Sequence, residues 1–495
     1  MQARFDNSYA RDLPGLYVPW KPAEVPAPRL LYLNRPLAEE LGLDLATLPP
    51  GEVAAVIAGN RVPEGAEPIA QVYAGHQFGG FSPQLGDGRA VLLGEVVDRN
   101  GQRRDIALKG SGRTPFSRGG DGKAAVGPML REVIIGEAMH ALGIPTTRAL
   151  AVAATGEDVY RERVLPGAVL ARVAASHLRV GTFEFFASRD DREKLRQLAD
   201  YAIARHDPDL AGTPGRYLQL LARVTQRQAE LIAQWMNVGF IHGVMNTDNM
   251  TISGETIDYG PCAFMEAYDP RAVFSSIDHG GRYAYGNQPA IAQWNLARFA
   301  EALLPLVVGD NEDSAPAVAE ATAVLETFPK LFQAALLRGL RAKLGFAESG
   351  DDAADAGLAN DWLGLLHAQK VDFTLGWRRL ADAAAGNDAP LQSLFADAEP
   401  LNAWLTRWRA RCAQDATHST ETRVQQMRRA SPWVIPRNHR VEEALQAASE
   451  TDDLGPFERL LAALRNPYEV TAENAAYAQP APEAVTACYQ TFCGT

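Results

Sequence analysis

The segment HGVMNTDNMTISGETIDYG, residues 242–260, points most directly to how the rest of the chain folds. Asn249 and Asp258 offer two oxygen ligands of the kind that Mg²⁺ prefers, and a phosphate-handling site needs such a pair. The interval between them, MTISGETI, predicts a short hairpin that would return Asp258 beside Asn249. Either residue alone would more often be structural, because Asn and Asp are common turn residues.

The order of these residues is similar to the catalytic loop of protein kinases and small-molecule phosphotransferases. In both, an Asn lies seven positions after a His, and DYG (258–260) stands where those enzymes carry DFG. One position differs: Val244 replaces the catalytic Asp and cannot accept a proton. An acidic group is supplied instead at Asp248. The similarity therefore favours a kinase-like fold. Because the usual base is missing, it does not favour the activity of an ordinary kinase.

Strand signals dominate the sequence before residue 178. Residues 90–97 and 105–108 are apolar, β-branched runs separated by the turn-like DRNG, which predicts a β-hairpin. A glycine-rich loop at 110–122 and a helix over about 128–142 follow, and strand-like segments return at 149–153 and 164–173.

From about residue 180 the periodicity becomes helical. We therefore expect an α+β chain with a protein-kinase-like fold. A β-rich N-lobe over 1–178 would hold a Gly-rich turn, the Lys109 strand and the Glu132 helix. A helical C-lobe over 179–495 would hold the catalytic loop 242–250, the DYG motif 258–260 and a C-terminal extension.

Lys109 ends the strand RRDIALKG, as the phosphate-gripping lysine of a kinase does, and Glu132 lies in the following helix, where an ion pair would hold the lysine. The alternatives are a solvated strand-end lysine and a surface glutamate. Just upstream, Gly86 and Gly88 permit close approach of the backbone to phosphate, and Arg89 can bind phosphate with two nitrogens. An ordinary hairpin turn is the alternative there.

Two further groups of residues are weaker candidates. Asp121 and Gly122 lie in SRGGDGK (117–123), a composition suited to binding an anion or a ribose, or else to a flexible flap. Arg172 and Arg179 would share one helical face if ARVAASHLRV (171–180) is helical, and could then converge on a phosphate. Most charged arginines are surface residues, which is the alternative for this pair.

Composition limits the partners and the compartment. The net charge of -12 argues against a nucleic acid as the main partner. The N-terminus lacks the apolar run of a secretory signal, and no apolar stretch approaches the roughly 20 residues of a membrane span. Four cysteines are too few for a disulfide framework in a chain of 495 residues. We therefore expect a cytoplasmic protein.

The motifs QLGDGR (84–89), LKGSGRTPFSRGGDGK (108–123), HGVMNTDNM (242–250) and DYGPC (258–262) together resemble the selenoprotein O family, also called the YdiU or protein adenylyltransferase family. The resemblance extends to WVIPRNHRVEEAL (433–445), NPYEV (466–470) and TFCGT (491–495). It implies a pseudokinase in which ATP binds flipped, so that AMP is transferred to Ser, Thr or Tyr hydroxyls of proteins, with UMP from UTP as a second reaction. The enzyme itself is a further candidate acceptor.

The resemblance also implies a role for each matching residue. Asp248 would be the proton acceptor, and Asn249 with Asp258 would hold Mg²⁺ or Mn²⁺. The nucleotide contacts would be Gly86, Gly88, Arg89, Lys109, Asp121, Gly122, Arg172, Arg179 and Asp258. Two alternatives stay open: γ-phosphoryl transfer, and a silent scaffold that binds ATP without consuming it.

Some relatives in that family carry selenocysteine near the C-terminus, where this chain has Cys493. Cys262 follows the DYG motif, so we hypothesise a reversible disulfide between Cys262 and Cys493. Pairing of Cys488 with Cys493 would contradict it. A tail cysteine without function is the simpler alternative.

Overall fold

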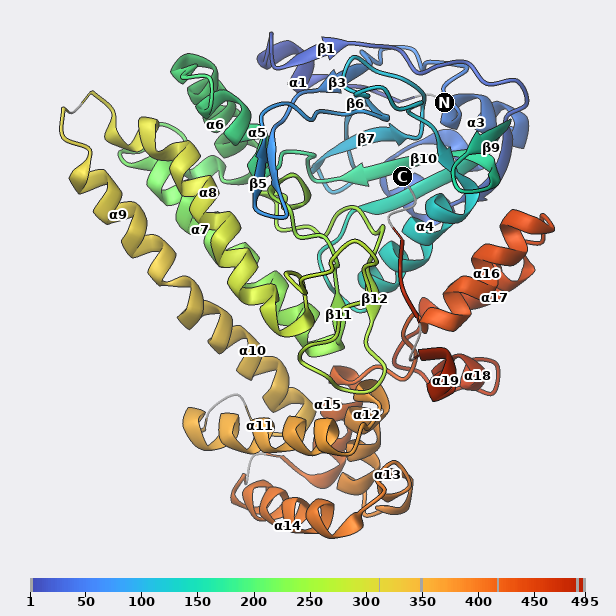
Figure 1. Ribbon diagram of the computed structural model, residues 1–495, viewed down its shortest axis with the longest axis vertical. Coiled ribbons are helices and arrows are strands. Elements are labelled where there is room, and N and C mark those ends of the chain that lie inside the picture. The colour runs from blue at the N-terminus through green and yellow to red at the C-terminus, as the bar shows by residue number, and fades with distance from the viewer. Residues whose placement is uncertain (1–2, 311, 348–349, 416–417, 487–488, 493–495) are drawn as a thin grey trace.

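The computed structural model describes residues 3–310, 312–347, 350–415, 418–486 and 489–492. Figure 1 shows a β-rich N-terminal part above a helical C-terminal part. Within the described residues, no helix combines the length and the apolar character needed to cross a membrane. The expected order of a β-rich part followed by a helical part is confirmed.

The N-terminal part is built on one antiparallel sheet with strand order β1-β3-β6-β7-β10-β9-β2, and β8 pairs with β10. The central hairpin β6–β7 is the one expected from sequence, and its register sets Lys109 opposite both Ala90 and Leu170. The strands are β1 Tyr17–Pro19, β2 Arg29–Leu33, β3 Ile69–Gln71, β6 Ala90–Val97, β7 Arg103–Lys109, β8 Ala124–Ala125, β9 Arg148–Tyr160 and β10 Val164–Ala174.

Helices cover both faces of this sheet. Because side chains alternate along a strand, Leu92 and Leu170 share a core with α4 Val126–Ala141, whereas Leu93 and Leu108 pack on the opposite face. That opposite face is covered by α2 Arg35–Glu40, η1 Asp44–Ala46 and α3 Pro50–Ile57, whereas α1 Ser8–Asp12 joins the core on the α4 side. The sheet is therefore buried on both sides, and α4, which carries Glu132, lies on the face toward the helical part.

The helical part begins after β10, and the strands in its described residues form one pair, β11–β12. Its elements up to the catalytic loop are α5 Val180–Ala187, α6 Arg192–His206, η2 Pro208–Leu210, α7 Arg216–Val238, β11 Phe240–Ile241 and η3 Thr247–Asn249. Those that follow are β12 Ala263–Phe264, η4 Tyr285–Asn287, α8 Gln288–Val308, α9 Ala315–Glu326 and α10 Phe328–Leu344. The pair β11–β12 brackets the segment 242–262 and so presents the catalytic loop toward the sheet.

A second hydrophobic cluster forms the end of the molecule farthest from the sheet (Figure 1). It buries Trp362, Trp377, Trp404 and Trp408 among the helices α11 Asp352–Ala368, α12 Phe373–Ala384, α13 Ala389–Gln392, α14 Ala398–Gln414 and α15 Thr420–Ala430. Lys343 is buried at the edge of this cluster, with its Nζ 5.6 Å from the centre of the Trp377 ring.

The C-terminal helices return to the N-terminal part, where α16 Asn438–Glu450 and α17 Gly455–Leu464 pack beside α4 (Figure 1). Val441 and Leu445 join the same core as Met129, and Arg131 pairs with Glu442 at 3.1 Å. The short helices α18 Ala475–Ala478 and α19 Glu483–Thr486 follow. Chain segments about 300 residues apart in sequence thus complete one core.

Two local expectations are wrong. Residues 171–180 are not one helix: Arg172 lies in β10 and Arg179 is the N-cap of α5. Residues 250–257 are not a hairpin either. The Thr251 hydroxyl does close a turn by donating to the Glu255 carbonyl, but Thr251 bridges to Arg179 and Thr256 bridges to Thr146 instead of to each other. Both segments pair with distant residues, which local periodicity does not reveal.

Candidate active site

A cavity of about 1140 Å³ lies where the sheet, α4, the catalytic loop and the C-terminal residues meet. Many of the residues expected from sequence line it: Gly88, Arg89, Lys109, Glu132, Arg172, Arg179, Asp248, Asn249 and Asp258. Val244, at the position of the kinase base, lines it as well. The structure therefore brings together residues that lie up to 170 positions apart.

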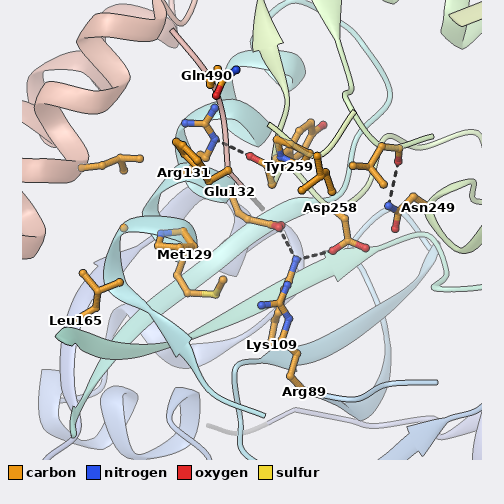
Figure 2. Close-up of a pocket in the computed structure, with 18 of the residues that line it drawn as sticks. Arg89, Lys109, Met129, Arg131, Glu132, Leu165, Asn249, Asp258, Tyr259 and Gln490 are labelled. Atoms are coloured by element: carbon orange, nitrogen blue, oxygen red, sulfur yellow. Dashed lines mark hydrogen bonds and ion pairs between the residues drawn. The ribbon is translucent and has the colours of Figure 1, made fainter. Parts of the chain in front are cut away.

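Lys109 is held between two carboxylates at the end of β7. Its Nζ donates to Glu132 Oε1 at 2.5 Å and to Asp258 Oδ1 at 2.5 Å, and Figure 2 shows it reaching between them. Lys109 and Glu132 are both buried. The strand end and α4 thus fix the ammonium group at the cavity wall, and a solvated strand-end lysine is excluded.

Asp258 is the most heavily paired anion of the site. Arg172 Nη1 donates to the same Oδ1 at 2.6 Å. Burial alone would raise the pKa of Asp258, but Lys109, Arg172 and Arg179 hold that pKa well below its usual range. The residue also adopts a left-handed backbone with φ of 62°, which is uncommon for a residue other than glycine. Its carboxylate is therefore ionised.

Two arginines have hydrogen-bonding capacity that the described part of the protein leaves unused. Arg179 Nη1 lies 3.6 Å from Asp87 Oδ1, and its guanidinium stacks 4.3 Å above the centre of the Tyr73 ring. Its Nε and Nη1, like Nη1 of Arg89, are buried without a hydrogen-bond partner. Buried polar groups are rarely left unpaired, so these nitrogens are suited to an anionic ligand in the cavity.

Asp248 lies in η3, between the sheet side and the helical side of the cavity. Its Oδ2 accepts a hydrogen bond from Gln77 Nε2 at 3.2 Å, whereas its Oδ1 is buried without a partner. Burial raises the pKa of Asp248 to about 6, although Arg179 opposes the shift. At neutral pH the carboxylate is mostly deprotonated and can accept a proton.

Asn249 and Asp258 fit a divalent cation that has few protein ligands. Asn249 Nδ2 donates to the Val244 carbonyl at 3.1 Å, which leaves Oδ1 as the end of the amide available to a cation. Lys109 and Arg172 both engage Oδ1 of Asp258 and leave Oδ2. No cluster of three or more His, Cys, Asp or Glu suited to a metal occurs in the described ranges. Mg²⁺ accepts such a site because it keeps waters and substrate phosphates as ligands.

Three expected nucleotide residues do not line the cavity as the structure describes it. Gly86 has φ of 83°, and a Cβ there would lie 2.5 Å from the Phe116 ring, so it admits Phe116. Asp121 forms an ion pair with Arg161 at 2.8 Å. A Cβ on Gly122 would lie 2.2 Å from the Gly112 carbonyl oxygen. Gly86 and Gly122 thus allow close packing against and within the loop 110–123, none of whose residues lines the cavity.

Sequence reasoning missed several lining residues, among them Tyr73, Gln77 and Asn246. Tyr73 and Gln77 lie around the hairpin of β4 Gly75–Gln77 and β5 Gly80–Ser82. The glycines of AGHQFGGF (74–81) signal this turn, but nothing local shows that it lies against the catalytic loop.

Cys262 is a buried free thiol, and burial raises its pKa to about 11. Cys488 and Cys493 lie outside the described residues, so their pairing is not tested. The described end of the tail does come close: Thr491 Oγ1 donates to the Pro261 carbonyl at 2.6 Å.

Comparison with known proteins gives close full-length matches. A family model described as protein adenylyltransferase SelO matches residues 1–465. A protein nucleotidyltransferase YdiU of Cereibacter sphaeroides is 62% identical over 496 residues, covering 100% of both chains. That of Chromobacterium violaceum is 62% identical over 488 residues, covering 98% of this chain and 100% of its own. That of a Bradyrhizobium species is 58% identical over 492 residues, covering 99% of each.

Proposed function

Because this chain belongs to the SelO family of protein adenylyltransferases and is a protein nucleotidyltransferase, we propose that it transfers AMP from ATP to Ser, Thr or Tyr hydroxyls of proteins and releases pyrophosphate. The nucleotidyltransferase activity follows from the family. The proposal adds the donor, the transferred group and the acceptor. The observation that carries it is that Asp248 lines one cavity with two arginines that have unused nitrogens, where Val244 replaces the kinase base.

The nucleotide is proposed to occupy the cavity with its phosphates against Lys109, Arg89, Arg172 and Arg179. These side chains supply the positive charge that a triphosphate needs, and the buried Glu132 keeps Lys109 in place. Asp121 and Gly122 would join the nucleotide contacts if the loop 110–123 closes over the cavity, which requires Asp121 to leave Arg161.

Asp248 is proposed as the general base. It takes the proton of the acceptor hydroxyl as the oxygen attacks the α-phosphorus, and the bond from that phosphorus to the bridging oxygen of pyrophosphate breaks. The arginines and Lys109 neutralise the charge that develops on the leaving group.

Asn249 and Asp258 would hold Mg²⁺ or Mn²⁺. When bound, the metal supplies neutralising charge to the phosphate oxygens. We further propose that residues 1–178 and 179–495 form the two lobes of a kinase-like fold. We also propose that UTP can replace ATP and that the enzyme itself is among the acceptors. Its proposed compartment is the cytoplasm.

A labelling experiment tests which phosphorus is attacked. With Mg²⁺ or Mn²⁺ and casein as a hydroxyl-rich acceptor protein, label from [α-³²P]ATP should enter protein, label from [γ-³²P]ATP should not, and pyrophosphate should be released. Incorporation of the γ label would make the protein a kinase. Incorporation of neither label into any acceptor protein, the enzyme included, would favour the silent scaffold.

A further inference from the structure

Three consecutive residues of the β4–β5 hairpin are hydrogen-bonded to three consecutive residues of the catalytic loop. His76 N donates to Thr247 Oγ1 at 2.7 Å, and Gln77 Nε2 donates to Asp248 Oδ2 at 3.2 Å. Phe78 N donates to Asn246 Oδ1 at 3.1 Å. The hairpin and the loop are about 170 residues apart in sequence, so these bonds join two otherwise separate parts of the site.

Close packing accompanies the hydrogen bonds. A Cβ added to Gly75 would lie 2.8 Å from Asp248 Oδ1, so only glycine lets β4 approach the carboxylate this closely. The preceding residue is held as well, since Ala74 N donates to the Gly181 carbonyl at 2.9 Å. The hairpin is therefore fastened both to the loop that carries Asp248 and to the start of α5, which Arg179 caps.

The loop residue next to Asp248 is fixed from a second side. Thr247 Oγ1 accepts from His76 N and donates to Glu184 Oε2, while the other oxygen of Glu184 contacts His76 Nδ1. Glu184 is buried in α5. This closed set of bonds fixes the backbone at Thr247, but none of its bonds reaches the Asp248 carboxylate. Among the described side chains, the Gln77 amide is the hydrogen-bond donor to that carboxylate.

The tip of the hairpin reaches the cavity. Gln77 and Phe78 both line the cavity, and the Phe78 side chain is 40% exposed. Gln77 is paired with Gly80, so no side chain across the hairpin covers its amide.

We propose that Gln77 is a positioning residue for the transfer: its amide holds the Asp248 carboxylate in the orientation that receives the acceptor proton. This rests on the proposed function, since it takes Asp248 as the base. Oδ2 can accept from Gln77 and from the hydroxyl together, because a carboxylate oxygen has two lone pairs. Gln77 acts through Asp248 and takes no proton.

The test measures transfer of the α label from ATP to casein by the full-length enzyme. Gln77→Leu keeps the size of the side chain and removes its hydrogen bond. We expect kcat to fall about tenfold or more, because a freely rotating base spends less time in the productive geometry. The KM for ATP should stay within about twofold. Gln77→His, whose Nε2 lies equally many bonds from Cβ, should recover part of kcat.

Phe81→Leu is the matched control, because it lies on the same hairpin, beside His76, on the face opposite Gln77. It should leave kcat and KM near wild type. Wild-type kcat in Gln77→Leu would overturn the proposal. So would equal losses in Gln77→Leu and Gln77→His, which would mean that the hairpin needs glutamine for its own folding. Failure of wild-type enzyme to transfer the α label would instead contradict the proposed function and leave the Gln77 geometry in place.

Discussion

Replacing Asp258 with asparagine should tighten the binding of metal-free ATP while it abolishes turnover. Asp258 Oδ1 lies 2.5 Å from Lys109 Nζ and 2.6 Å from Arg172 Nη1, so it occupies the cations that are proposed to hold phosphate. Without a metal on Asp258, its negative charge repels the triphosphate. Asp258→Asn removes this charge and keeps the shape of the side chain.

The size of the effect follows from the distances. A phosphate oxygen held by the same two cations would lie about 5 Å from the carboxylate. Two unit charges at that distance interact by about 3 kcal/mol at an effective dielectric constant of about 20. The Asp258 side chain is 23% exposed, and if solvent screens up to half of the interaction, about 1.5 to 3 kcal/mol remains. The dissociation constant should therefore fall by about 10- to 150-fold.

Isothermal titration with ATP in EDTA measures this change, and transfer of the α label with Mg²⁺ measures turnover. Asp382→Asn is a suitable control, because Asp382 also pairs with two arginines, Arg379 and Arg428, but lies in α12 away from the cavity. Its ATP affinity should not change. Unchanged or weaker binding of metal-free ATP by Asp258→Asn would refute the placement of the phosphates at Lys109 and Arg172.

Two further predictions concern ionisable groups. Because the pKa of Asp248 is raised to about 6 and the base works deprotonated, the transfer rate should fall as the pH drops below about 6. The Asp248→Asn variant should lose about 10²- to 10⁴-fold in transfer rate and still bind ATP, and a retained rate would exclude Asp248 as the base. Lys343→Met should stabilise the tryptophan cluster at pH 7, because burial lowers the pKa of Lys343 from 10.5 to about 7 and the unfolded chain then binds more protons than the folded one. The difference in free energy of unfolding between Lys343→Met and wild type should shrink by about 2 kcal/mol between pH 7 and pH 9, because wild type gains stability with rising pH. Denaturant unfolding followed by tryptophan fluorescence measures this difference, and a value independent of pH would contradict the prediction.

Local patterns predicted the parts of the fold that depend on local chemistry. The hairpin β6–β7 follows from two apolar, β-branched runs around a turn, and helix α4 follows from helical periodicity, so the setting of Lys109 and Glu132 could be anticipated. Asp248 and Asn249 could be proposed as site residues because their spacing from His242 is similar to that of a kinase catalytic loop.

The parts that depend on distant pairing were missed or wrong. Gln77 meets Asp248 only through the packing of the β4–β5 hairpin on the catalytic loop. Arg172 reaches the cavity from a strand and Arg179 reaches it from a helix cap, so the two arginines do not share the helical face that was considered from the sequence. Asp121 pairs with Arg161, 40 residues away, which no spacing in the sequence indicates.

The return of α16 to α4 has a consequence for synthesis on the ribosome. Helix α4 ends at Ala141, and α16, which covers it, starts only at Asn438. At about 5 to 20 residues per second, the side of α4 that packs on α16 lacks its partner for roughly 15 to 60 s. Nascent chains should expose this surface to chaperones throughout that interval, and a message truncated before α16 should yield a product that aggregates even though it encodes the entire sheet.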